Sequence, residues 1–323
     1  MGRRCLLLIL IGILLSSGCG RGQESQIDHV KDKMKIGIML SDVGLGDQSF
    51  SDSAFKGLVR ARDELGILFD YREIKDTKTY EKGLTELVKQ GNDVIVGLGF
   101  MVQEDLEKVA KKYPKQQFVL IDAVSNLQNV SSITFKADQG SYLAGVVAAL
   151  TTKSNVLGFI GGDDVPTIQQ FSEGFQKGAK VVKPNITIIE KYAGNFGDDK
   201  LGSQITKQMI AQKADVIYAA AGFTGVGMLK EAQKEKVLAI GVDTDQYFYA
   251  EKAVVTSMLK HVDVALFEIA AQLTKKGVVT KKQQELGIDE NGVGLAPIRV
   301  VSLTKEQEDR LKKEKEKLTN GNY

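Results

Sequence analysis

The sequence predicts an α/β fold with two lobes, each a doubly wound parallel sheet flanked by helices. Short apolar runs alternate with longer amphipathic segments, which is the pattern of strand–helix–strand units in a parallel sheet. The alternation restarts near the middle of the chain. The chain has only 4 prolines and no low-complexity linker between its halves. We therefore expect one body with two lobes and a cleft, rather than two tethered domains.

The first half supplies five predicted strands and three predicted helices. The apolar run KIGIML at 35–40 predicts the first strand, and the first helix is expected at 49–65, where Leu58 and Leu65 share one helical face. The further strands are expected at 68–74, 93–99, 117–122 and 131–135, and the further helices at 79–90 and 103–112.

The second half repeats this alternation and ends in a charged segment. Strands are expected at 155–162, 187–194, 214–222, 237–243 and 253–260, and helices at 141–151, 168–182, 200–212, 225–235 and 264–275. An apolar stretch, GVGLAPIRVV, follows at 292–301. Residues 305–317 mix Lys and Glu at helical spacing, which is typical of a solvated terminal helix.

The first residues predict export. Arg3 and Arg4 precede an unbroken apolar run at 6–15, and small residues follow it. A basic start, an apolar centre and a small-residue exit form a secretory signal peptide, which we place at 1–18. The apolar run is shorter than the about 20 residues that a membrane-spanning helix needs.

Cys19 is the expected lipidation site. It directly follows Ser-Gly, which resembles a bacterial lipobox, although Ser16 stands where that box usually has Leu. The alternative is an ordinary cleaved signal followed by a chance Cys. Residues 19–33 are polar and charged, so we expect a flexible tether there. The protein would then be anchored by lipid to the extracytoplasmic face of the cell membrane.

Composition argues against several classes of function. The chain has 43 Lys and Arg against 41 Asp and Glu. Loss of the two arginines of the signal balances these charges, so no nucleic-acid partner is expected. The cysteines are Cys5 and Cys19, which leaves no thiol in the folded part for a nucleophile or a metal. His261 is the single histidine there, so a catalytic triad or a His-rich metal site is not expected either.

The residues after each predicted strand are the candidates for ligand contacts, because ligands bind beyond the carboxyl ends of strands in open parallel sheets. They are rich in Asp, Gly and Phe and poor in catalytic bases, which favours holding a small polar molecule with a flat apolar part. The Gly-rich turn at 222–227 does not match the dinucleotide fingerprint, and no Walker motif occurs. These candidates lie at 41–42, 99–101, 122–123, 161–163, 194–196, 221–223, 243–245 and 260.

Motifs over about residues 35–300 resemble, in collinear order, those of the basic membrane protein family, the nucleoside-binding lipoproteins of bacterial ABC importers. They include SDVGLGDQSFSDSAFKG, VLIDA, FKADQGSYLAGVVAA, GFIGGDDVP, YAGNFGD, ADVIYAAAGFTGVG, AIGVDTDQ and TSMLKHVD. The resemblance implies a type I periplasmic-binding-protein fold. It places lobe 1 at 34–135, completed by about 260–323, and lobe 2 at 136–259.

The resemblance also implies ligand-binding residues. Asp42 matches a residue that meets the base edge, and Asp122 one that lines the base end. Phe50 and Phe196 match the two rings that stack on the base. The remaining matches are Gly222, which leaves room beside its backbone, and Asp243 and Lys260, which form the ribose-binding pair. Ser51 stands where the family usually has Asn.

The function implied by the resemblance is capture of a purine nucleoside such as guanosine, inosine or adenosine, without a cofactor and without catalysis. The ligand would pass to an ABC permease and its ATPase. A ligand-sensing or regulatory lipoprotein on the same fold is the alternative. A nucleoside hydrolase is a second alternative, against which the lack of His and Cys among the candidate residues argues. The sequence leaves open which nucleoside is bound.

Overall fold

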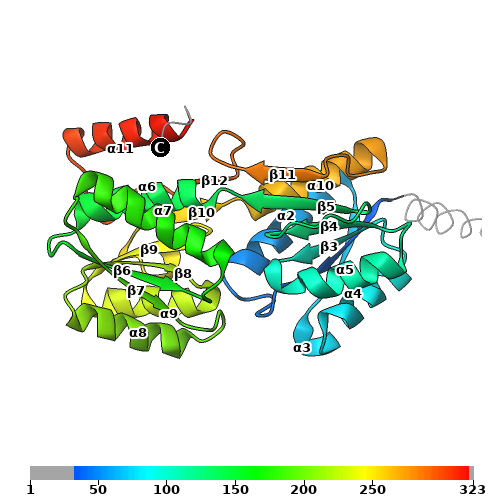
Figure 1. Ribbon diagram of the computed structural model, residues 1–323, viewed down its shortest axis with the longest axis horizontal. Coiled ribbons are helices and arrows are strands. Elements are labelled where there is room, and N and C mark those ends of the chain that lie inside the picture. The colour runs from blue at the N-terminus through cyan, green and yellow to red at the C-terminus, as the bar shows by residue number, and fades with distance from the viewer. Residues whose placement is uncertain (1–32, 320–323) are drawn as a thin grey trace, which may run out of the picture. The chain divides into compact units, whose positions relative to one another are not determined.

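The computed structural model describes residues 33–319 (Figure 1). The predicted signal peptide, Cys19 and all but the last residue of the tether lie outside the described residues. Residues from Lys35 onward contain two six-stranded sheets. In the first, all strands are parallel, in the spatial order β11 (Gln283–Leu286), β5 (Val130–Phe135), β4 (Gln117–Ile121), β3 (Val94–Leu98), β1 (Lys35–Met39) and β2 (Leu68–Arg72).

Helices cover both faces of the first sheet (Figure 1). Helices α4 (Tyr80–Lys89) and α5 (Gln103–Lys112) pack on one face. Their apolar side chains form a buried cluster with those of β1, β3 and β4. The other pair is α2 (Phe50–Leu65) and α10 (Val262–Lys276), and the single-turn α3 (Ile74–Thr77) and η1 (Phe100–Val102) precede α4 and α5.

The second sheet is parallel except for one edge strand. Its order is β12 (Val293–Leu295), β10 (Val254–Lys260), β9 (Leu238–Asp243), β8 (Val216–Ala220), β6 (Val156–Gly161) and β7 (Thr187–Tyr192), with β12 antiparallel to β10. Its helices are α6 (Ala137–Thr151), α7 (Pro166–Val182), α8 (Asp199–Ala211), α9 (Gly222–Glu235), η2 (Tyr247–Tyr249) and α11 (Lys305–Thr319).

Helices α6 and α7 lie on one face of this sheet, and α8 and α9 on the other (Figure 1). The first pair packs closely enough for backbones to touch. A Cβ at Gly178 would overlap the carbonyl of Tyr142, and one at Gly145 the carbonyl of Phe175. The doubly wound arrangement predicted for each half is therefore confirmed.

Several segments differ from the sequence prediction, and two of them have a clear physical reason. The strand expected at 68–74 ends at Arg72, and Ile74 begins α3, whose last turn closes through Lys78 in the left-handed region. The second is β11, whose sequence QQEL lacks the apolar run that is typical of a buried strand. It pairs with β5 at the edge of the sheet, where exposed positions tolerate polar side chains.

The charge pattern of the C-terminal helix predicts that solvent surrounds it, but the structure shows that one face is buried. Glu314 is fully buried and accepts a hydrogen bond of 2.7 Å from the hydroxyl of Tyr142 on α6. Arg310 and Lys317 form ion pairs with the same carboxylate. Leu318 packs beside Tyr142 in a small buried apolar cluster. Burial of the acid is thus compensated by three partners.

The segments after residue 260 divide between the two sheets. Helix α10 and strand β11 belong with the first sheet, whereas β12 pairs with β10 of the second and α11 packs on α6. The predicted lobe boundaries, with lobe 1 completed by about 260–323, stay a prediction.

Candidate functional site

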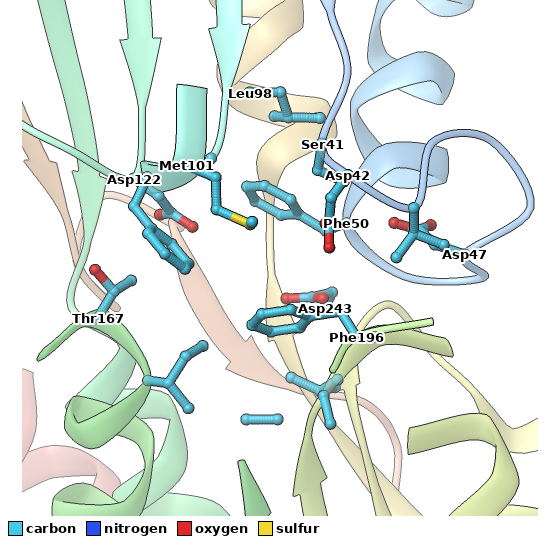
Figure 2. Close-up of a pocket in the computed structure, with 18 of the residues that line it drawn as sticks. Ser41, Asp42, Asp47, Phe50, Leu98, Met101, Asp122, Thr167, Phe196 and Asp243 are labelled. Carbon is cyan, nitrogen blue, oxygen red and sulfur yellow. The ribbon is translucent and has the colours of Figure 1, made fainter. Parts of the chain in front are cut away.

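A pocket lies where the carboxyl ends of strands from both sheets meet. Its empty space, including the part open to solvent, is about 660 Å³. Figure 2 shows Phe50, which begins α2, and Phe196, from the loop after β7, pointing into the same space. All seven residues that the sequence analysis proposed as ligand contacts line this pocket: Asp42, Phe50, Asp122, Phe196, Gly222, Asp243 and Lys260. The structure thus brings candidates from both halves of the chain together.

Asp42 lies half-buried in the pocket wall, shortly after β1. Burial raises the pKa of its carboxyl above the ordinary value. Repulsion from Asp163, which follows β6, adds to the rise, whereas a backbone hydrogen bond from Val43 opposes it. A carboxylate held in this way gains stability from any donor that a ligand supplies.

Ser51 does not line the pocket. It is fully buried, and its hydroxyl lies 2.7 Å from the hydroxyl of Ser41, which does line the pocket. The side chain of Ser51, which stands where the family usually has Asn, therefore contacts the pocket wall through Ser41.

Asp47 is a pocket residue that the sequence analysis did not select. It is only 2% exposed, and its carboxylate accepts hydrogen bonds from the backbone N–H groups of Ser49, Ser51 and Asp52 at 3.0, 2.7 and 3.1 Å. Burial raises the pKa of Asp47 to about 6, against the lowering effect of these bonds. The Asp47 carboxylate therefore caps the N-terminus of α2.

Lys260 and Asp122 form an ion pair across the two sheets. Their side chains are 4% and 9% exposed. The ammonium nitrogen of Lys260 also lies 4.7 Å from the ring centroid of Phe50 and 5.6 Å from that of Phe171. Such contacts stabilise a desolvated cation. Both Asp122 and Asp243 have positive φ angles, of 65° and 63°, so the chain turns sharply at Asp122, just after β4, and at Asp243, the last residue of β9.

Asp243 lies beside this pair, and its direct partner is Ser49, whose hydroxyl donates to Oδ2. Burial raises the pKa of Asp243, and the charge of Lys260 and the Ser49 hydrogen bond oppose the rise. Lys260 therefore influences Asp243 by charge and contacts Asp122 directly. The family resemblance pairs Lys260 with Asp243, whereas the direct ion pair of Lys260 is with Asp122.

The two rings proposed to stack on a base have different surroundings. The ring of Phe196 is tilted by 59° against that of Phe100, with centroids 6.4 Å apart. A Cβ at Gly162 would overlap the Phe196 ring, so Gly162 makes room for it. The ring of Phe50 instead faces the Lys260 ammonium group.

The Gly-rich turn at 222–227 begins α9, and local geometry accounts for Gly227 and Gly222. A Cβ at Gly227 would overlap the carbonyl of Asp199, where α8 and α9 cross. Gly222 has φ of 54°, and its Cα faces the backbone carbonyl of Phe196.

Other pocket residues gave no signal in the sequence. Thr167, Ile168 and Phe171 reach the pocket from the start of α7, one turn or more beyond the end of β6. The convergence of strand ends in a parallel sheet predicts nothing about side chains on the first turns of a following helix.

Within residues 33–319, no group of three or more His, Cys, Asp or Glu is placed to hold a metal ion. In the same range, no helix is long and apolar enough to cross a membrane. His261 lies at the start of α10 and not in the pocket.

The chain is similar to known binding proteins over nearly its whole length. Residues 34–322 match the family model described as ABC transporter substrate-binding protein PnrA-like. The chain belongs to this family. It is 34% identical to an uncharacterised lipoprotein of Pyrococcus horikoshii, over 90% of this chain and 76% of that one. It is 33% identical to the ABC transporter nucleoside-binding protein BmpA of Lactococcus lactis, over 87% and 88%.

A crystal structure of an ABC transporter solute-binding protein from Aeropyrum pernix has the same fold, with a TM-score of 0.81 and 26% identity, over 89% of this chain and 92% of that one. The type I periplasmic-binding-protein fold and the resemblance inferred from motifs are therefore confirmed. As a member of the PnrA-like family, the chain is an ABC transporter solute-binding protein and not an enzyme.

Proposed function

We propose that this PnrA-like protein captures a purine nucleoside in the pocket and delivers it to an ABC permease. The observation that carries the proposal is the convergence of two aromatic rings, Phe50 and Phe196, with carboxylates from both sheets in one pocket. The Lactococcus relative is named as a nucleoside-binding protein, which supports the same ligand class. Stacking on aromatic rings contributes about 1–3 kcal/mol per base.

The charges of the pocket favour an uncharged nucleoside over a nucleotide. Four carboxyl groups line it, from Asp42, Asp47, Asp122 and Asp243, against the single cation of Lys260. Carboxylates accept hydrogen bonds from ribose hydroxyls and base N–H groups, and bonds to charged groups contribute about 1.5–3 kcal/mol. A phosphate would instead meet an excess of negative charge, with Lys260 already paired to Asp122.

Calorimetric titration of the folded domain tests this proposal, since the chain has no Trp to serve as a fluorescent probe. We expect inosine, guanosine or adenosine to bind, and the matching monophosphates to bind at least about tenfold more weakly. Mass spectrometry of small molecules that co-purify with the protein identifies the preferred base. If no nucleoside binds, the proposal is wrong.

Delivery to a permease is tested in cells. Deletion of the chain should lower uptake of the labelled nucleoside that binds in vitro, and re-expression should restore it. Binding in vitro with unchanged uptake in the deletion strain would contradict a transport role and favour the sensing alternative.

We further propose that Cys19 carries the lipid and that the protein sits on the extracytoplasmic face of the cell membrane. A related Pyrococcus protein is named as a lipoprotein. We expect Cys19→Ala to leave an unprocessed precursor or to release the protein into the medium. Cell fractionation with immunoblotting measures this outcome. A Cys19→Ala protein of mature size that still fractionates with membranes would contradict lipidation at this residue.

Gly162→Ala should weaken nucleoside binding about 5- to 20-fold while the domain stays folded. The added Cβ would overlap the Phe196 ring, and a displaced ring loses part of its stacking energy. Gly294→Ala is the matched control, because a Cβ there would meet no atom within 4 Å. Titration of both variants compares them, and equal affinity in the two would show that the position of the Phe196 ring does not matter.

A further inference from the structure

The N-terminus of α2 has an unusual division of roles between Asp47 and Ser49. Ser49 directly precedes the helix, where a serine side chain normally accepts hydrogen bonds from the second or third backbone N–H of the helix. Here those N–H groups, of Ser51 and Asp52, donate to Asp47. The Ser49 side chain makes no capping hydrogen bond.

The hydroxyl of Ser49 is instead directed to the second sheet. It is fully buried and donates to Oδ2 of Asp243. Within the described part of the chain, no protein donor contacts the other oxygen, Oδ1, of this carboxylate. One oxygen is thus held by the protein, and the second is left for another donor.

The backbone next to Ser49 is held from the same side. The carbonyl oxygen of Gln48 accepts hydrogen bonds from Nε2 of Gln246, at 3.0 Å, and from the hydroxyl of Thr244, at 3.4 Å. Gln246 is itself 1% exposed and bonded to the backbone of Val242, one residue before Asp243. Ser49 and Asp243 are therefore fixed relative to each other by their neighbours as well as by their own bond.

We propose that Ser49 is a positioning residue that orients the Asp243 carboxylate toward the ribose hydroxyls of the ligand. This inference rests on the proposed function, in which Asp243 meets the ribose. By donating to Oδ2, Ser49 fixes the rotation of the carboxylate and directs Oδ1 into the pocket. Because Asp47 caps the helix, the serine hydroxyl is available for this purpose.

Ser49→Ala tests the inference through sugar selectivity. We expect the parent protein to bind inosine more tightly than 2′-deoxyinosine, because the deoxy ligand lacks one donor to Asp243. In Ser49→Ala, inosine affinity should fall about 5- to 30-fold and 2′-deoxyinosine affinity less than about 3-fold, so that selectivity largely disappears. Calorimetric titration at one pH measures both affinities; guanosine and adenosine pairs are used in the same way if inosine is not the preferred base.

Two controls separate positioning from a general structural effect. Thr79 is a true helix cap, since its side chain accepts from the backbone N–H of Lys82 at 3.2 Å, and it lies outside the pocket. Thr79→Ala should lower the melting temperature and leave both affinities unchanged. In an Asp243→Ala background, Ser49→Ala should have no further effect on selectivity, since the residue it positions is gone.

The outcomes distinguish this inference from the proposed function. Suppose that the parent binds nucleosides. The positioning role is then wrong if Ser49→Ala weakens binding of inosine and 2′-deoxyinosine equally, or weakens neither. It is also wrong if Ser49→Ala still changes sugar selectivity in the Asp243→Ala background, and in each case the proposed function stands. If the parent binds nucleosides without preferring ribosides, the ribose role of Asp243 and this inference both fail. A parent that binds no nucleoside overturns the proposed function and the inference with it.

Discussion

Replacing Lys260 with alanine is expected to destabilise the protein by about 3–5 kcal/mol at neutral pH. Its ammonium group is 4% exposed and forms an ion pair with Asp122, which is 9% exposed. Removal of one partner of a buried pair leaves the other charge desolvated and uncompensated, which costs more than the pair itself contributes. Contacts of the ammonium group with the rings of Phe50 and Phe171 are lost as well. Urea unfolding of parent and variant measures the difference.

The stability deficit of Lys260→Ala should shrink as the pH falls from 7 toward 5. Burial already raises the pKa of Asp243, and the charge of Lys260 opposes that rise, so removal of Lys260 raises this pKa further. An acid with a folded-state pKa above its unfolded value of about 3.9 destabilises the fold when ionised, and protonation relieves the cost. Unfolding measured at several pH values gives the trend. A deficit that grows on acidification would contradict it.

A double variant keeps this prediction testable even if Lys260→Ala folds poorly. Lys260→Met with Asp122→Asn removes both charges and keeps similar volumes, so it should recover most of the lost stability. Lys112→Ala is the exposed control, because Lys112 pairs with Glu81 at a site where its side chain is 61% exposed. We expect a change below about 1 kcal/mol there. Equal losses at positions 112 and 260 would show that burial of the pair is not the cause.

Most of the fold follows from apolar patterning, because a buried parallel strand must be apolar on both faces. Strand β3 is fully buried and was predicted to within one residue at each end. Strand β11 shows where this reasoning fails. It lies at a sheet edge and reads QQEL, so its pairing with β5 depends on the position of distant residues and not on its own composition.

The pocket could be located from the sequence because strand ends converge in an open parallel sheet. Its internal partnerships could not. By local rules Ser49 would cap the helix, but its hydroxyl donates to Asp243, which is distant in sequence, and Asp47 takes the capping role instead. The pairing of Lys260 with Asp122 likewise joins residues from different sheets, and local sequence carries no information about such a contact.

Replacing Phe50 or Phe196 with alanine is expected to weaken nucleoside binding by about 1–3 kcal/mol each, or roughly 5- to 150-fold in affinity. Each ring lines the pocket, Phe50 from the start of α2 and Phe196 from the loop after β7, so a planar base bound between them would contact a ring on each side (Figure 2). The Phe50 substitution should have the larger effect, because its ring also lies 4.7 Å from the Lys260 ammonium group. Calorimetric titration measures both affinities.

Two phenylalanines outside the pocket provide matched controls. Phe55 lies on the same helix as Phe50, but its ring packs edge-on against Phe69 and Tyr71. We expect Phe55→Ala to lower stability and leave affinity unchanged. Phe248 is 75% exposed, so Phe248→Ala should change neither stability nor affinity.

If Phe50→Ala and Phe196→Ala bind nucleosides as tightly as the parent, the rings only support the fold. If Phe55→Ala weakens binding as much as Phe50→Ala, the effect comes from α2 as a whole. Only loss of affinity confined to Phe50 and Phe196, with folding intact, agrees with a base held between two rings.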